Sequence, residues 1–72
     1  MTEKEFIEKM QEDVLDTDAD ITLDMVLSDV EEWDSLSFVS FIAMAKESGF
    51  ANVNREVVNE AKTVKDLFEL VK

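Results

Sequence analysis

The chain contains no cysteine and no histidine among its 72 residues. Without cysteine it can form no disulfide and offers no thiolate for redox or nucleophilic chemistry. Without histidine it lacks the side chain that most often serves as general base near neutral pH. The sequence therefore predicts that the chain is not an enzyme, and the absence of cysteine fits a reducing, cytoplasmic environment.

Proline is also absent, and Gly49 is the single glycine, so helix ends must be recognised from capping residues. No segment approaches the run of ~20 apolar residues that would cross a bilayer, and the N-terminus opens with charged residues rather than an apolar signal. We therefore expect no membrane insertion.

Basic residues are scarce, with 7 Lys and Arg against 18 Asp and Glu, which gives a formal charge of −11. A surface of this charge repels nucleic-acid phosphates and anionic lipids, so the expected partners are proteins with basic patches. The chain is nevertheless 46% hydrophobic, too apolar for a disordered acidic tail. We expect a folded monomer.

Four capping patterns predict four helices. The first helix begins at Thr2, in T-E-K-E, and ends near Asp16; the second begins at Asp34 and ends near Ser48, before Gly49. A short third helix follows Asn54, and the fourth begins at Thr63 in T-V-K-D. The predicted fold is all-α, a small four-helix bundle of three longer helices and one short helix, forming one domain over residues 1–72.

A long loop, residues 17–33, separates the first two helices. Its apolar residues are spaced so that they could hold the loop against the core. They are Ile21, Leu23, Val26, Leu27 and Val30.

The second helix is apolar on two sides. At ~100° per residue, one stripe is expected to face the core; it comprises Phe38, Phe41, Ile42 and Ala45. The opposite stripe comprises Leu36, Val39 and Ala43, together with Ser40 and Glu47. A small bundle buries this second stripe less well, so it is a candidate contact surface. The alternative is that the loop covers it and the helix is packed on both sides.

Ser35 follows the capping Asp34, so its hydroxyl is expected at an exposed helix N-terminus, where a phosphate is well accommodated. It cannot be the nucleophile of a catalytic triad, because no histidine is present to activate it. Taken alone, Ser35 could be only a favourable residue for starting a helix.

The segment W-D-S-L, at residues 33 to 36, opens an apolar helix in the middle of a small acidic domain. In this the chain resembles the acyl carrier and peptidyl carrier proteins, over essentially its whole length. The resemblance implies that Ser35 carries a covalent 4′-phosphopantetheine, whose thiol holds acyl or aminoacyl cargo as a thioester. It implies that a phosphopantetheinyl transferase and its metal ion engage Asp34. It also implies that cargo-loading and acyl-transfer enzymes contact Leu36, Val39 and Ala43.

Two features depart from the fatty-acid branch of that family. Ser37, Ser40 and Lys46 occupy positions that are often acidic on the exposed side of the helix, and Trp33 replaces a small residue before D-S-L. Both favour a carrier of a specialised pathway over a housekeeping fatty-acid carrier.

Two alternatives come from other functional classes. Asp16, Asp18, Asp20 and Asp24 match positions 1, 3, 5 and 9 of a calcium-binding EF-hand loop, but Ile21 and Leu27 replace its glycine and its bidentate glutamate. We therefore expect no metal site, with weak divalent-cation binding as the alternative. The other alternative is an acidic helical adaptor that carries no prosthetic group.

Overall fold

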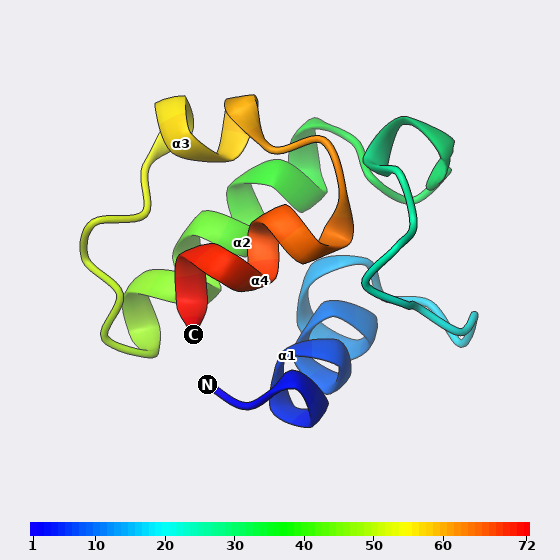
Figure 1. Cartoon of the computed structure of the whole chain (residues 1–72), viewed down its shortest axis with the longest axis horizontal. Coiled ribbons are helices and arrows are strands. Elements are labelled where there is room, and N and C mark those ends of the chain that lie inside the picture. The colour runs from blue at the N-terminus through cyan, green and yellow to red at the C-terminus, as the bar shows by residue number, and fades with distance from the viewer.

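Helices joined by loops and tight turns make up the computed structural model, which describes all 72 residues. In chain order the elements are α1 (Glu3–Lys9), a π turn (Met10–Val14), a 3-10 turn (Leu27–Asp29), α2 (Ser35–Glu47), α3 (Arg55–Glu60) and α4 (Val64–Val71) (Figure 1). There are no strands. The chain is thus a small all-α domain with three helices of seven residues or more, and none of its helices has the length and apolar character that a membrane crossing requires.

The predicted caps are present at the helix starts. At α1, Thr2 Oγ1 accepts a hydrogen bond from Glu5 N at 3.2 Å while Glu5 Oε1 accepts one from Thr2 N. Thr63 and Asp66 form the same reciprocal capping box at α4. These bonds satisfy backbone N–H groups that have no partner inside the helix, which explains why the four starts fall where the sequence predicts.

The π turn ends the first helical segment. The N–H of Leu15 donates to the carbonyl of Met10 at 2.8 Å, a spacing of five residues, and Val14 and Leu15 are both buried. Asp16 then has a φ of 50°, in the left-handed region that Asp tolerates better than most residues. The predicted end near Asp16 is confirmed, but the wide final turn was not anticipated.

The C-terminus of α2 follows the predicted glycine cap. Gly49 has a φ of 95°, its N–H donates to Lys46 O, and the N–H of Phe50 donates to Ala45 O at 2.9 Å. This pair of bonds is the Schellman arrangement, which only a residue free to adopt positive φ completes without strain.

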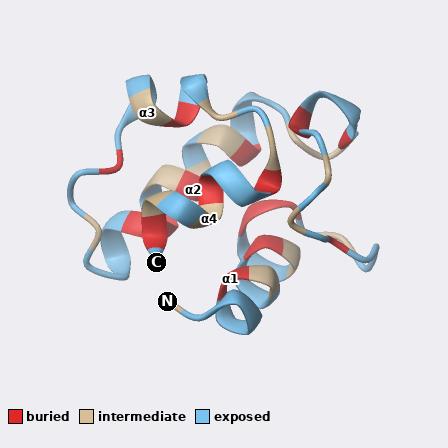
Figure 2. Cartoon of the chain, viewed as in Figure 1, coloured by how far each residue is buried: buried red, intermediate tan, exposed pale blue.

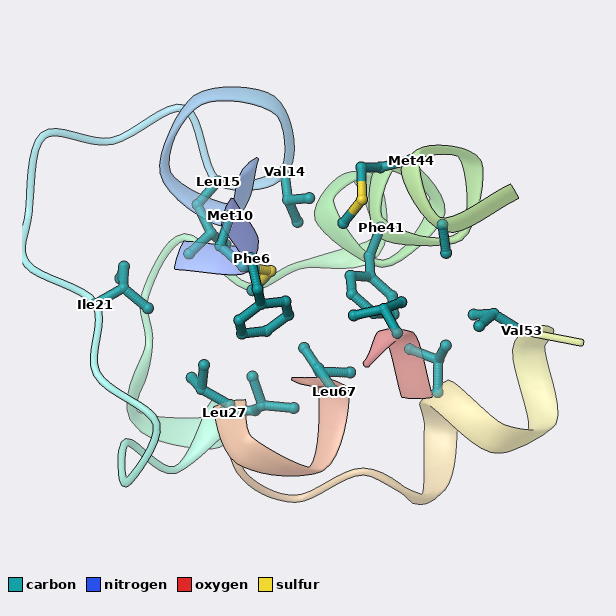
Figure 3. Packing of buried hydrophobic residues seen from close by; sticks show 14 of the residues in the cluster. Phe6, Met10, Val14, Leu15, Ile21, Leu27, Phe41, Met44, Val53 and Leu67 are labelled. Carbon is teal, nitrogen blue, oxygen red and sulfur yellow. The ribbon is translucent and has the colours of Figure 1, made fainter. Parts of the chain in front are cut away.

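One hydrophobic core holds these elements together. Side chains from α1, the π turn, α2 and α4 point toward a common interior, joined by Ile21 and Leu27 from the long loop and by Val53 before α3 (Figure 3). Phe6 of α1 lies 5.2 Å from Phe68 of α4 between ring centroids. Buried positions of all the helices face this interior, while exposed ones cover the outside (Figure 2).

The long loop is pinned to α4, and one predicted contact is wrong. Ile21, Leu27 and Val30 are buried, but Val26 is 41% exposed. Val26 lies in extended backbone and forms an isolated antiparallel bridge with Thr63. Neighbouring side chains alternate in such a segment, so Leu27 points inward and Val26 outward.

Candidate functional site

Asp34 caps the N-terminus of α2. Its Oδ1 accepts hydrogen bonds from the N–H groups of Leu36 and Ser37, both at 3.0 Å. Hydrogen bonds from the Ser37 backbone, the Ser37 hydroxyl and the Leu36 backbone lower the pKa of the Asp34 carboxyl below its ordinary value. The carboxylate is therefore the form that caps the helix, and its Oδ2 accepts no hydrogen bond from the chain.

Ser35 is the first residue of α2 and is exposed. The hydrogen bonds at this helix start are made by Asp34 and Ser37, so the Ser35 hydroxyl is not required for the cap. Asp34 already accepts the N–H groups of Leu36 and Ser37, but the dipole of the 13-residue helix still favours negative charge at this end. An anionic group attached to Ser35 would thus lie at the positive end of the helix dipole, beside the Asp34 carboxylate, and in open solvent.

Ser37 is buried, although the sequence placed it on the exposed side of the helix, and that prediction is wrong. It is the single buried polar residue, with 5% exposure. Its hydroxyl donates to the Glu32 carbonyl and lies 3.2 Å from Oδ1 of Asp34. Ser37 therefore ties together the chain on both sides of Trp33, and its burial is possible because both hydroxyl contacts are polar.

Trp33 supports this segment from the core side. Its ring centroid lies 6.3 Å from that of Phe38 and 6.4 Å from that of Phe41, separations at which tilted and edge-to-face rings attract. The side chain is half-buried and packs against the core. Trp33 and Ser37 together fix the backbone that presents Asp34 and Ser35.

The outward face of α2 is apolar and exposed. Leu36 is 76% exposed, Val39 is 51% exposed, and Ala43 is exposed as well. We call these three residues the outer strip. The long loop does not cover them, so the alternative of a helix packed on both faces does not apply. The strip begins one residue after Ser35.

The inward face of α2 is rotated from the predicted stripe. Phe41 and Ala45 are fully buried as expected, whereas Phe38 and Ile42 are only half-buried. Met44 and Ser37 complete the buried face instead. Ser37, Phe41 and Met44 follow the i, i+4, i+7 spacing of one helix face, and this spacing was the signal in the sequence that would have placed Ser37 correctly.

The aspartates of the long loop do not gather. No three acidic side chains lie where they could hold a metal ion together. Thr17 Oγ1 donates to Glu32 at 3.0 Å and Gln11 Nε2 donates to the Ala19 carbonyl at 2.9 Å. These bonds fasten the loop without drawing Asp16, Asp18 and Asp20 into a ligand set.

Comparisons of the chain with models of protein families, with curated proteins and with solved structures found no match.

Proposed function

We propose that this chain is a carrier domain that receives 4′-phosphopantetheine on Ser35 and shuttles acyl or aminoacyl cargo between partner enzymes. The observation that carries the proposal is the pairing of an exposed serine at the start of α2 with the outer strip beginning at the next residue. A modifying enzyme needs access to the hydroxyl and a surface to hold, and both occur here side by side.

The residues present fit this prosthetic group. Ser35 is exposed and unneeded for the cap, so its Oγ can form a phosphodiester at the helix N-terminus. In that transfer the bond from the phosphate to the nucleotide part of coenzyme A breaks, and the transferase accepts the hydroxyl proton. Oδ2 of Asp34 is free to engage the transferase's metal ion. When attached, the group supplies the thiol that the chain itself lacks.

The overall plan is compatible with a carrier of this family. The chain consists of three longer helices, the short α3 and a long loop between α1 and α2. We propose that these elements form the carrier-type bundle. The charge of −11 suits a monomer that meets partners with basic patches. In this proposal the chain itself is not an enzyme and acts in the cytoplasm.

Intact mass tests the modification directly. The folded chain is incubated with coenzyme A, magnesium ion and a broad-specificity phosphopantetheinyl transferase. We expect one phosphopantetheine-sized increase in the wild type and none in Ser35→Ala. Ser28→Ala removes another exposed serine and should be modified normally. A folded wild-type chain left unmodified by several such transferases would contradict the proposal.

An acidic adaptor without a prosthetic group is the second candidate, because the outer strip alone would give it a contact surface. Such an adaptor has no use for the Ser35 hydroxyl. The same mass experiment separates the two: partner binding that persists in Ser35→Ala, with no modification of the wild type, would favour the adaptor.

A further inference from the structure

A second surface lies away from Ser35, between α1 and the long loop. It is an open groove with a volume of about 550 Å³, against about 270 Å³ for the hollow beside Phe38. One wall is a face of α1, from Glu3 to Glu8, and the other is the loop segment 21–24. No residue of the outer strip lines it.

The floor of the groove is apolar. Ile21 is buried, while Ile7 and Leu23 are half-buried and pack against the core from its edge. Their outer surfaces remain in contact with solvent, so an apolar group seated on them would be removed from water at about 25 cal/mol per Å² of buried area. The five residues from the third to the seventh of the chain rise ~6 Å along α1. The floor therefore suits one or two aliphatic side chains.

Both walls are held in place by the rest of the fold. On the loop side, the N–H of Lys65 donates to the Leu23 carbonyl and the N–H of Val64 donates to the Met25 carbonyl, both at 2.9 Å. On the helix side, Phe6 and Met10 are fully buried in the core. The groove is thus formed before any partner arrives, which reduces the ordering cost of binding.

The rim of the groove carries acidic side chains that form no ion pair. Glu3 and Glu8 stand on the α1 wall and Asp24 on the loop wall, with Lys4 as the single cation. The two ion pairs of the chain join Lys9 to Asp13 and Lys72 to Glu69. Lys4 is therefore not within ion-pair distance of Glu3 or Glu8. Asp24 Oδ1 accepts a hydrogen bond from Thr22 Oγ1, but no carboxylate on either wall forms an ion pair, so both walls can receive positive charge.

We propose that this groove binds a basic amphipathic segment of a partner protein, with an aliphatic side chain on Ile7 and Leu23 and lysine or arginine facing Glu3, Glu8 and Asp24. The negative charge of the groove's rim favours a basic segment over other partners. A second copy of the chain would bring further negative charge to an acidic rim, and an acidic segment would be repelled in the same way. The proposal does not depend on modification of Ser35.

The binding probe is a synthetic amphipathic peptide of leucine and lysine, about 14 residues long, close to four helical turns. It is titrated into the ¹⁵N-labelled Ser35→Ala chain while backbone chemical shifts are recorded. We expect the largest shifts in residues 3–8 and 21–24. A lysine-only peptide should bind more weakly because it lacks the apolar anchor, and a leucine and glutamate peptide should not bind.

A matched pair of variants separates the groove from the general charge of the protein. The groove variant combines Glu3→Gln, Glu8→Gln and Asp24→Asn. The control combines Glu12→Gln, Asp18→Asn and Glu60→Gln, which are exposed positions outside the groove. Both lose the same charge, yet we expect the groove variant to bind the peptide about tenfold more weakly than the control.

Four results would overturn the proposal. They are equal weakening by the two variants, shifts centred on Leu36 and Val39 instead of the groove, no binding of the leucine and lysine peptide, and self-association of the chain through the groove in sedimentation. None of these bears on the mass experiment at Ser35, so the two proposals fail independently.

Discussion

Helices α2 and α4 begin in the same way but use their apolar residues differently. Each has a side-chain cap, supplied by Asp34 in α2 and by Thr63 with Asp66 in α4. In α4 the buried residues are Val64, Leu67 and Val71, all at 0% exposure. Its exposed positions are polar: Lys65, Asp66 and Glu69.

Helix α2 has a comparable inward face, with Phe41 and Ala45 at 0% exposure, but it also exposes Leu36 and Val39 on the outside. Packing explains every apolar residue of α4 and leaves the outer strip of α2 unexplained. Exposed aliphatic side chains give nothing to the stability of an isolated domain. The difference between the helices therefore falls on the surface that our proposal assigns to partner enzymes.

The largest expected effect separates the two faces of α2. Phe41→Asp buries an unpaired carboxylate and should cost at least 3–5 kcal/mol, against a total stability of roughly 4–11 kcal/mol for a chain of this length. We expect loss of most far-UV helicity at room temperature. Val39→Asp places the same charge on the outer strip and should keep the helicity. If both variants unfold alike, packing accounts for both apolar faces of α2, as it accounts for the apolar residues of α4, and the contrast between the helices is lost.

The second prediction tests the use of the outer strip. Leu36→Ser and Val39→Ser should slow transferase modification of Ser35 about tenfold or more each, because central apolar contacts dominate docking, while melting temperatures change little. Val26→Ser is the control, since Val26 is 41% exposed, against 51% for Val39, but lies outside α2. Equal slowing by Val26→Ser would mean that the strip has no special role.

Local sequence predicted much of this fold because helix caps are local. Thr2 with Glu5, Asn54, and Thr63 with Asp66 lie within a few residues of the groups they satisfy. Gly49 likewise needs only the preceding turn. The exposure of the outer strip followed from the angle between successive residues.

What the sequence did not predict depends on distant contacts. Val26 faces outward because its backbone pairs with Thr63, which lies far along the chain. Ser37 is buried because α2 is rolled so that its hydroxyl meets the Glu32 carbonyl. The π turn places Val14 and Leu15 together in a core made by other helices. Helical periodicity contains none of this information.

The third prediction concerns the buried hydroxyl beneath the site. Ser37→Ala leaves the Glu32 carbonyl without its donor and removes a contact to Asp34, so we expect a loss of about 1–2 kcal/mol in urea unfolding. Ser40→Ala, on the same helix and half-buried, should change stability by less than about 0.5 kcal/mol. Equal costs would show that the Ser37 bonds contribute nothing special to the start of α2.

The smallest expected effect concerns what the two helices share. Hydrogen bonds from the backbone of Ser37 lower the pKa of Asp34, and those from the backbones of Lys62 and Thr63 lower the pKa of Asp66, in both cases from 3.8. Because folding lowers both pKa values, the stability these groups add is complete above the unfolded value and is lost as pH falls through the folded one.

The side-chain oxygen of asparagine can accept the same backbone hydrogen bonds as an aspartate oxygen, but asparagine does not titrate. Asp34→Asn and Asp66→Asn should therefore change stability little at neutral pH, and each should reduce the loss of stability seen below about pH 4. Urea unfolding from pH 7 to pH 2 measures this, with Asp18→Asn as the control for loss of an exposed carboxyl that makes no hydrogen bond. We expect similar changes from the two variants, since each aspartate accepts hydrogen bonds from two backbone N–H groups and folding lowers both pKa values. A change in Asp34→Asn alone would show that α2 differs from α4 in its cap as well as in its outer strip.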